Sequence, residues 1–249
     1  FGLTQDSSNL YATGRVSREV FKIPKADPTT ISVLLASGML TGDVAYPTFL
    51  NGFVYVPHGD GVAKIDASSG ATTLITTGVQ MWVCDNDSSL VFCTAINSGR
   101  LYEINPTTNT ATLRVSGLSS PAGLKITGSD IYVAQDVAGG SVVRISRSSW
   151  AIAATGTVSS GTNDKPYSPM LIGDFLILST EGTGSAIGNR NIYVFNPTTM
   201  ALLAVIQSPV KTTETIDGVP TQVVRPLFMQ ATNGVDIVVA FQGSSGSAQ

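Results

Sequence analysis

The sequence repeats one pattern, in which an apolar tetrad is followed by a polar loop and a second apolar tetrad. Successive first tetrads lie 44, 37, 40, 45 and 61 residues apart. They begin at Asn9, Phe53, Leu90, Asp130, Phe175 and Asp236. Self-similarity with a period near 40 residues is typical of repeat architectures, in which each unit buries its apolar face against a neighbour. This spacing constrains the fold more than any single motif.

Each repeat reads as four short strands. The second tetrads often alternate apolar and polar positions, as a half-buried strand requires. They occupy 20–23, 62–65, 101–104, 142–145 and 192–195. Turns rich in Asp, Asn, Ser, Pro and Gly follow them and lead to another apolar run. A further strand precedes the first tetrad, joined to it by a turn such as Asn51-Gly52, whose residues tolerate positive φ.

Four antiparallel strands every 40 to 45 residues predict an all-β fold, a β-propeller of about six four-stranded blades. The last blade is incomplete within this chain, since 225–241 supplies only two strands, and 208–224 is an insertion before it. The 25 Gly and 12 Pro leave little room for helix. We expect one propeller domain over 1–242, followed by a polar tail or linker over 243–249.

One stretch of the chain carries a family resemblance. Gly-Leu-Ser-Ser-Pro-Ala-Gly-Leu at 117–124 is followed by Asp-Ile-Tyr-Val-Ala at 130–134 and Val-Val-Arg-Ile at 142–145. The run resembles NHL and YVTN-type propeller repeats, and 54–66 and 101–106 follow the same pattern in weaker form. The resemblance implies a propeller fold and, as in many relatives, a face that binds protein, glycan or a small molecule. The resemblance implies no catalytic residues for this chain.

The composition limits the classes of partner. Lys and Arg number 14 against 17 Asp and Glu, so no excess of positive charge is present to neutralise nucleic-acid phosphates. The apolar run at 235–241 is far too short to cross a bilayer as a helix. We therefore expect neither a nucleic-acid partner nor membrane insertion. A surface rich in Ser, Thr and Gly, with only 12% charged residues, favours an extracellular, cell-surface or virion location.

The charged residues gather in one class of loop. In a four-stranded blade, the loop joining the second strand to the third opens on the same face as the segment joining one blade to the next. These loops vary in length and charge here, whereas the turns opposite them are short and alike, so we expect recognition on the variable face. The predicted ligand-binding residues are Arg15, Arg18, His58, Asp60, Arg100, Asp136, Glu181 and Arg190.

Candidate catalytic chemistry is sparse. His58 is the only histidine, and although Asp60 is near, neighbours in a tight loop form a poor side-chain pair and no Ser or Cys is marked as a nucleophile. We predict no catalytic residue, no metal and no cofactor, and interpret the chain as a noncatalytic recognition or structural propeller that binds a protein or a glycan. One alternative is a lactonase-like, metal-dependent hydrolase that uses carboxylates such as Asp60, Asp136 and Glu181. Another is an oligomeric structural component whose sixth blade is closed by another chain.

Other residues have structural interpretations. Cys84 and Cys93 lie on two strands of one hairpin, and we expect buried free thiols, with a disulfide as the alternative. Trp82 and Trp150 are expected to pack between blades rather than to stack on a sugar. Asn86 begins a match to the glycosylation acceptor pattern, which matters only after secretion.

Overall fold

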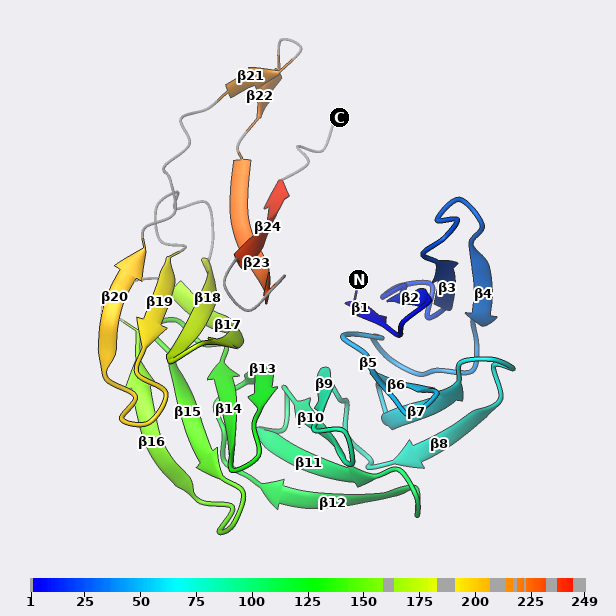
Figure 1. The fold of residues 1–249 in the computed structure, drawn as a ribbon, viewed down its shortest axis with the longest axis horizontal. Coiled ribbons are helices and arrows are strands. Elements are labelled where there is room, and N and C mark those ends of the chain that lie inside the picture. The colour runs from blue at the N-terminus through cyan, green and yellow to red at the C-terminus, as the bar shows by residue number, and fades with distance from the viewer. Residues whose placement is uncertain are drawn as a thin grey trace. The chain divides into compact units, whose positions relative to one another are not determined.

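The computed structural model describes residues 2–158, 164–182 and 191–206, together with the strands at 214–216, 219–221, 223–231 and 237–243. Side chains are described for 2–158, 164–180 and 191–206. Every regular element within these residues is a β-strand (Figure 1). The chain divides into an N-terminal unit, Phe1–Ser129, and a C-terminal unit, Asp130–Gln249. The part of the chain described includes no helix long and apolar enough to span a membrane.

The strands form five four-stranded sheets, each in chain order. The first contains β1 (Gly2–Gln5), β2 (Asn9–Thr13), β3 (Val20–Pro24) and β4 (Ser32–Leu35). The second contains β5 (Thr48–Leu50), β6 (Phe53–His58), β7 (Gly61–Asp66) and β8 (Thr72–Thr76). The third contains β9 (Val83–Asn86), β10 (Val91–Ala95), β11 (Arg100–Asn105) and β12 (Thr110–Val115). The fourth contains β13 (Pro121–Ile126), β14 (Asp130–Gln135), β15 (Ser141–Ser146) and β16 (Ile152–Thr157). The fifth contains β17 (Asp164–Ile172), β18 (Phe175–Gly182), β19 (Ile192–Phe195) and β20 (Leu202–Ile206).

The repeat predicted from the sequence is confirmed strand by strand. The first tetrads fall on the second strand of each sheet and the second tetrads on the third strand. In the N-terminal unit, β1, β5, β9 and β13 lie next to one another in succession, so consecutive sheets meet along their first strands. Sheets arranged in this way bury both faces of their middle strands, which is why β6 and β10 are almost continuously buried.

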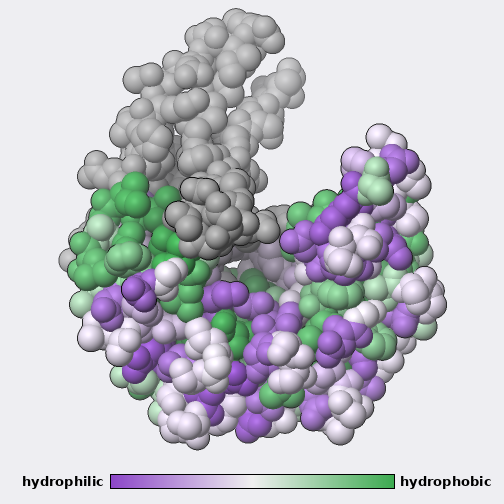
Figure 2. Space-filling model, viewed as in Figure 1, coloured by the Kyte–Doolittle hydropathy of each residue, from purple (hydrophilic) through white to green (hydrophobic). Residues whose placement is uncertain are grey.

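Outer strands are exposed by contrast. The extreme case is β20, where every residue is exposed, four of them Leu, Val or Ile. Figure 2 shows the hydrophobic surface that results beside this strand.

Recurrent five-residue turns connect the third strand to the fourth. In three of them the fifth residue, Gly70, Trp150 or Met200, has φ between 57° and 75° and donates its N–H to the carbonyl of the first residue. Asp66 caps its turn by accepting from the backbone N–H groups of Ser68 and Ser69 at 2.9 and 2.8 Å. The turns are alike because this hydrogen-bond pattern, rather than a partner, determines their shape.

The core consists of the layers between consecutive sheets. Between the second and third sheets it includes Tyr55, Met81, Cys93, Tyr102 and Ile104, all buried. The aromatic members of this layer, Tyr55 of β6 and Tyr102 of β11, therefore pack the second sheet against the third. Trp82 is 8% exposed, which confirms packing rather than an open stacking surface.

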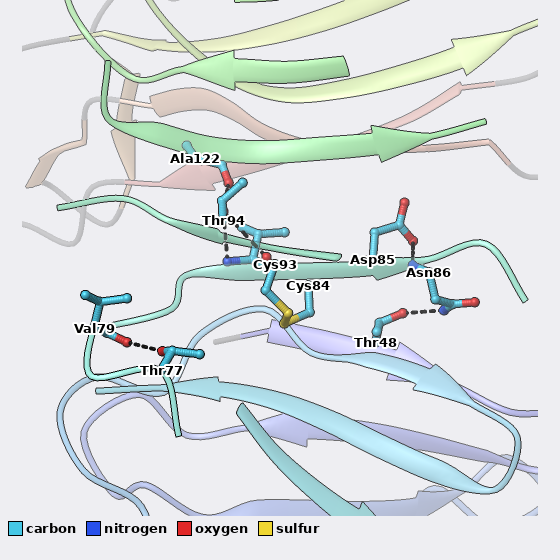
Figure 3. The surroundings of a disulfide bond; sticks show 10 residues. Thr48, Thr77, Val79, Cys84, Asp85, Asn86, Cys93, Thr94 and Ala122 are labelled. Atoms are coloured by element: carbon cyan, nitrogen blue, oxygen red, sulfur yellow. Dashed lines mark hydrogen bonds between the residues drawn. A yellow bond between two sulfur atoms is a disulfide. The ribbon is translucent and has the colours of Figure 1, made fainter. Parts of the chain in front are cut away.

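The expectation of free thiols at Cys84 and Cys93 is wrong, because the two residues form a disulfide (Figure 3). They are directly opposite each other in the pairing of β9 with β10, with their Cα atoms 4.2 Å apart. The turn 87–90 sets this register.

Asn86, beside the turn 87–90, is the first residue of the glycosylation match. Its side-chain amide donates to Thr48 Oγ1 at 2.7 Å and to the carbonyl of Phe49 at 3.1 Å, so this side chain is engaged in hydrogen bonds within the fold.

The last strands form two-stranded sheets. Short strands β21 (Glu214–Ile216) and β22 (Val219–Thr221) pair within the predicted insertion. Strands β23 (Val223–Ala231) and β24 (Ile237–Gly243) pair antiparallel, and β23 lies next to β17 and β18 of the fifth sheet. The two strands predicted for the incomplete sixth blade are thus present. Gly243 ends β24, and 244–249 of the predicted tail lie outside the described residues.

Candidate functional site

The N-terminal unit brings several loops together on one side of its sheets. We call this side the loop face, and define it by 14–19, 36–47, 59–60, 77–82, 96–99 and 116–120. Backbone hydrogen bonds join three of these segments, because Gly59 donates to Thr41 at 2.7 Å and Thr77 donates to Asp60 at 2.9 Å. These three segments of the loop face therefore form one connected layer.

Arg15 lies at the centre of one group on this face. Its Nε donates to Asp43 Oδ2 at 2.9 Å, and its guanidinium carbon lies 5.3 Å from the centre of the Trp82 ring. Tyr46 contacts the same indole edge-on, with ring centroids 6.1 Å apart. The guanidinium therefore lies over the indole of this aromatic pair and is oriented by a carboxylate from the segment between the first two sheets.

His58 ends β6 and is 3% exposed. Its Nδ1 accepts from the backbone N–H of Asp60 at 3.3 Å and lies 3.3 Å from Thr41 Oγ1. Its Nε2 is buried, with no hydrogen-bond partner among the described residues. Burial lowers the pKa of this imidazole, although the Asp60 carboxylate acts in the opposite direction. His58 is therefore an interior residue of the loop face, and its ring is not open to a ligand.

Two further predicted residues flank loops of the N-terminal unit. Arg18 is exposed in 14–19 with φ of 58°, where its N–H donates to the carbonyl of Gly14 at 2.8 Å. Arg100 begins β11 and donates to Tyr102 Oη at 3.4 Å. Val16, two positions before Arg18 in the same loop, is 89% exposed.

In the C-terminal unit, Asp136 follows β14 and its side chain is 14% exposed. Lys165 Nζ lies 3.8 Å from its Oδ1. Burial raises the pKa of Asp136, and the nearby Lys165 opposes that shift. Asp164 is the residue before Lys165, at the start of β17, and it is buried. It accepts hydrogen bonds from Asn191 at 2.9 Å and from Tyr193 at 2.8 Å. This polar group holds β17 to β19.

The side chains of the last two predicted site residues, Glu181 and Arg190, lie outside the described residues. Glu181 lies in β18, before the loop that joins the second strand to the third, and Arg190 lies outside the described residues. Among the side chains that are described, no group of three or more His, Cys, Asp or Glu residues is arranged to hold a metal ion.

The predicted residues contact partners that are distant from them in the sequence. Asp43 is 28 positions from Arg15, and Trp82 lies immediately before the first strand of the third sheet. Both lie in segments between sheets, and charge in such a segment was the available signal for Asp43. Nothing in the sequence indicates that Arg15 covers the indole, because such a contact depends on how neighbouring sheets pack.

Comparison with solved structures identifies the architecture. The WD40 β-propeller domain of Doa1 matches with a TM-score of 0.70 and 12% identity, over 98% of this chain and 75% of that one. The chain has a β-propeller fold. This propeller also resembles a chain of the mitotic checkpoint complex, with a TM-score of 0.67 and 15% identity over 85% of this chain and 64% of that one.

A third similar structure is hydrazine synthase from Kuenenia stuttgartiensis, with a TM-score of 0.69 and 13% identity, over 90% of this chain and 69% of that one. At such identities the likeness concerns the fold alone. No protein-family model and no curated protein matches the sequence. The NHL and YVTN resemblance therefore rests on the motifs of the repeat.

Proposed function

We propose that this propeller is a noncatalytic interaction module that binds a protein through its loop face. The observation that carries the proposal is the contrast between its two kinds of connection. The turns between third and fourth strands repeat one hydrogen-bond pattern, whereas 14–19, 59–60 and 96–99 differ in length, charge and contacts. Loops that are not constrained to one hydrogen-bond pattern can vary in length and charge to suit a binding partner.

The chemistry of the face supports a protein in preference to a glycan. Exposed Val16 lies between Arg15 and Arg18, and apolar contact surrounded by guanidinium groups is typical of protein interfaces. The indole of Trp82, the natural platform for a sugar, is already covered by Arg15. Similar propellers in a WD40 domain and in the mitotic checkpoint complex support the same class of function.

We also propose that the protein works outside the cytoplasm. The Cys84–Cys93 disulfide supports this location, because disulfides persist in oxidising compartments and are rare where glutathione keeps thiols reduced. The charge-poor surface rich in hydroxyl groups is consistent with it. An affiliation with NHL or YVTN-type propellers belongs to the same proposal.

A photo-crosslinking amino acid placed at Val16 tests the binding face. The matched control places it at Ser69, which is exposed on a turn at the opposite end of the strands. We expect one protein to be captured from the native environment through position 16 and not through position 69. Arg18→Glu and Arg100→Glu should then weaken its binding by about 1–3 kcal/mol, while Lys25→Glu on the opposite side changes it little. Equal capture at both positions would contradict the assignment of the face.

A second candidate is an assembly in which another chain supplies strands to the sheet of β23 and β24. The supporting observation is that, among the described residues, this sheet has two strands, whereas each complete blade has four. Strand addition at an unpaired edge is a common mode of assembly. Native mass spectrometry at several concentrations tests it, since a chain that stays monomeric throughout does not associate with copies of itself.

A further inference from the structure

The single histidine of the chain occupies the junction of three loop-face segments. The carbonyl of His58 accepts from the N–H of Met81 at 3.0 Å, and the next residue, Gly59, donates to the carbonyl of Thr41 at 2.7 Å. His58 Nδ1 contacts both Thr41 and Asp60. Segments 36–47, 59–60 and 77–82 therefore meet at this one residue.

The packing at the junction leaves little room for adjustment. A Cβ atom on Gly59 would lie 2.8 Å from Gly42 Cα, so the two backbones are in direct contact. The same segment continues to Asp43, which orients Arg15 over Trp82. Displacement of 41–43 would thus also remove the carboxylate that holds the guanidinium on the indole.

The imidazole is suited to this place only when it is neutral. Nδ1 accepts the Asp60 N–H, which assigns the proton of the neutral ring to Nε2. A second proton must then bind at Nδ1, where it displaces the Asp60 hydrogen bond and creates a buried cation. Acceptors near the ring are few, since Nε2 has no hydrogen-bond partner among the described residues and the hydroxyl of Thr41 is the one other group within reach of Nδ1.

The charged groups on the three segments give limited compensation. Asp60 is exposed and favours the imidazolium from a distance, whereas Asp43 is already paired with Arg15. Segment 77–82 carries no titratable side chain. Burial is the larger influence, and it lowers the pKa of His58 below the ordinary 6.5.

We infer that His58 is a pH-sensitive lock that holds 41–43 against the second blade and releases it on acidification, which uncovers Trp82. In the closed form 41–43 is held and His58 is buried, whereas in the open form 41–43 is released and the imidazole is solvated. Between pH 6.5 and the lowered pKa of His58, the closed form binds fewer protons than the open form. The lock is therefore fully stable above this window and weakens as the pH falls through 6.5. It operates whether or not the face binds a partner.

Hydrogen–deuterium exchange on the intact chain tests the lock. Between about pH 7.5 and about pH 5.5, protection factors of peptides covering 41–46 and 58–61 should fall by up to about tenfold, because a buried neutral histidine competes with a protonated one in the open form. Peptides from β14 and β15, which contain no imidazole, are the internal control. His58→Gln should abolish the pH response, whereas Asp60→Asn should enlarge it, because the imidazolium then loses its nearest carboxylate.

A second measurement keeps the inference testable if His58→Gln does not fold. Because the sequence contains one histidine, a single imidazole signal in the NMR spectrum of the unmodified protein reports its titration directly. A titration midpoint at or above 6.5, or protection of 41–46 that does not change with pH, would overturn the lock. Loss of the pH response in His58→Gln together with a depressed midpoint would establish it.

Discussion

Lys64 Nζ in β7 donates to the carbonyl oxygen of Pro106 at 2.6 Å and to Asn109 Oδ1 at 3.1 Å. Pro106 opens the turn after β11, so the contact ties the second blade to the third. The corresponding residue of the first blade, Lys22, donates in the same way to the carbonyl of Ala67 in the turn of the second blade, at 2.9 Å. A lysine at this position thus holds the first blade to the second and the second blade to the third, at the end opposite the loop face.

Replacing this lysine should weaken the junction between blades. Lys64→Met keeps most of the aliphatic chain but loses both hydrogen bonds and the ammonium that lies 4.4 Å from the Phe53 ring. We expect a loss of about 1 kcal/mol in the free energy of unfolding, measured by urea denaturation. The control is Lys25→Met, which removes a lysine whose hydrogen bond, to the carbonyl of Asp6 at 2.6 Å, stays within the first blade, and it should cost less. Equal losses in the two variants would mean that the interblade hydrogen bonds add nothing.

Reducing the disulfide should destabilise the third blade. Cys84 and Cys93 close a short loop, for which chain entropy predicts a stabilisation of about 2–3 kcal/mol. The double variant Cys84→Ala, Cys93→Ala should unfold at a lower urea concentration than the oxidised protein, and its midpoint should not change when a reductant is added. A midpoint of the unmodified protein that is equally insensitive to reductant would contradict a structural role for the bond.

Asp6 should stabilise the first blade in a pH-dependent way. Burial acts to raise its pKa, but hydrogen bonds from Tyr11 Oη at 2.7 Å and from the backbone of Ser8 and Asn9 outweigh burial and lower the pKa to about 2. The carboxylate therefore stabilises the fold above its ordinary pKa of 3.8, and this contribution is lost as the pH falls from 3.8 toward 2.

Thermal unfolding of Asp6→Asn tests that contribution. At neutral pH the variant should be less stable by about 1 kcal/mol, because an amide accepts these hydrogen bonds less strongly than a carboxylate. The difference should shrink as the pH approaches 2. A difference that does not change between neutral and acid pH would show that ionisation of Asp6 is not its cause.

The contact between Gly42 and Gly59 should tolerate no side chain. Gly59→Ala would place its Cβ 2.8 Å from the Cα of Gly42, which is backbone and cannot rotate away. We expect a loss of at least about 2 kcal/mol in the free energy of unfolding, with 41–46 exchanging faster. Gly128→Ala is the matched control, since no atom lies within 4 Å of the Cβ it would add. Wild-type stability in Gly59→Ala would mean that the two segments separate at little cost.

The sequence by itself determined the blades. Strand identity depends on local alternation of apolar and polar residues, and the turns depend on residues such as Asn51-Gly52 and Asp66, so both can be read from short stretches of chain. The repeat then specified which strands pair, because four consecutive strands joined by short turns form one antiparallel sheet. The loops that flank the predicted site residues followed from the same order.

Only the tertiary structure decided what those residues contact. His58 was predicted as part of a ligand-binding face, yet its ring is buried at the junction of three segments, because 36–47 and 77–82 close over it from neighbouring blades. The pairing of Arg15 with Asp43 and the cover it forms over Trp82 likewise depend on the distance between blades. The disulfide required the register of β9 with β10, which places the two sulfurs opposite each other. The contacts of His58 and Arg15 join residues from different segments whose separation in space is set by packing between blades, and no short stretch of sequence carries that information.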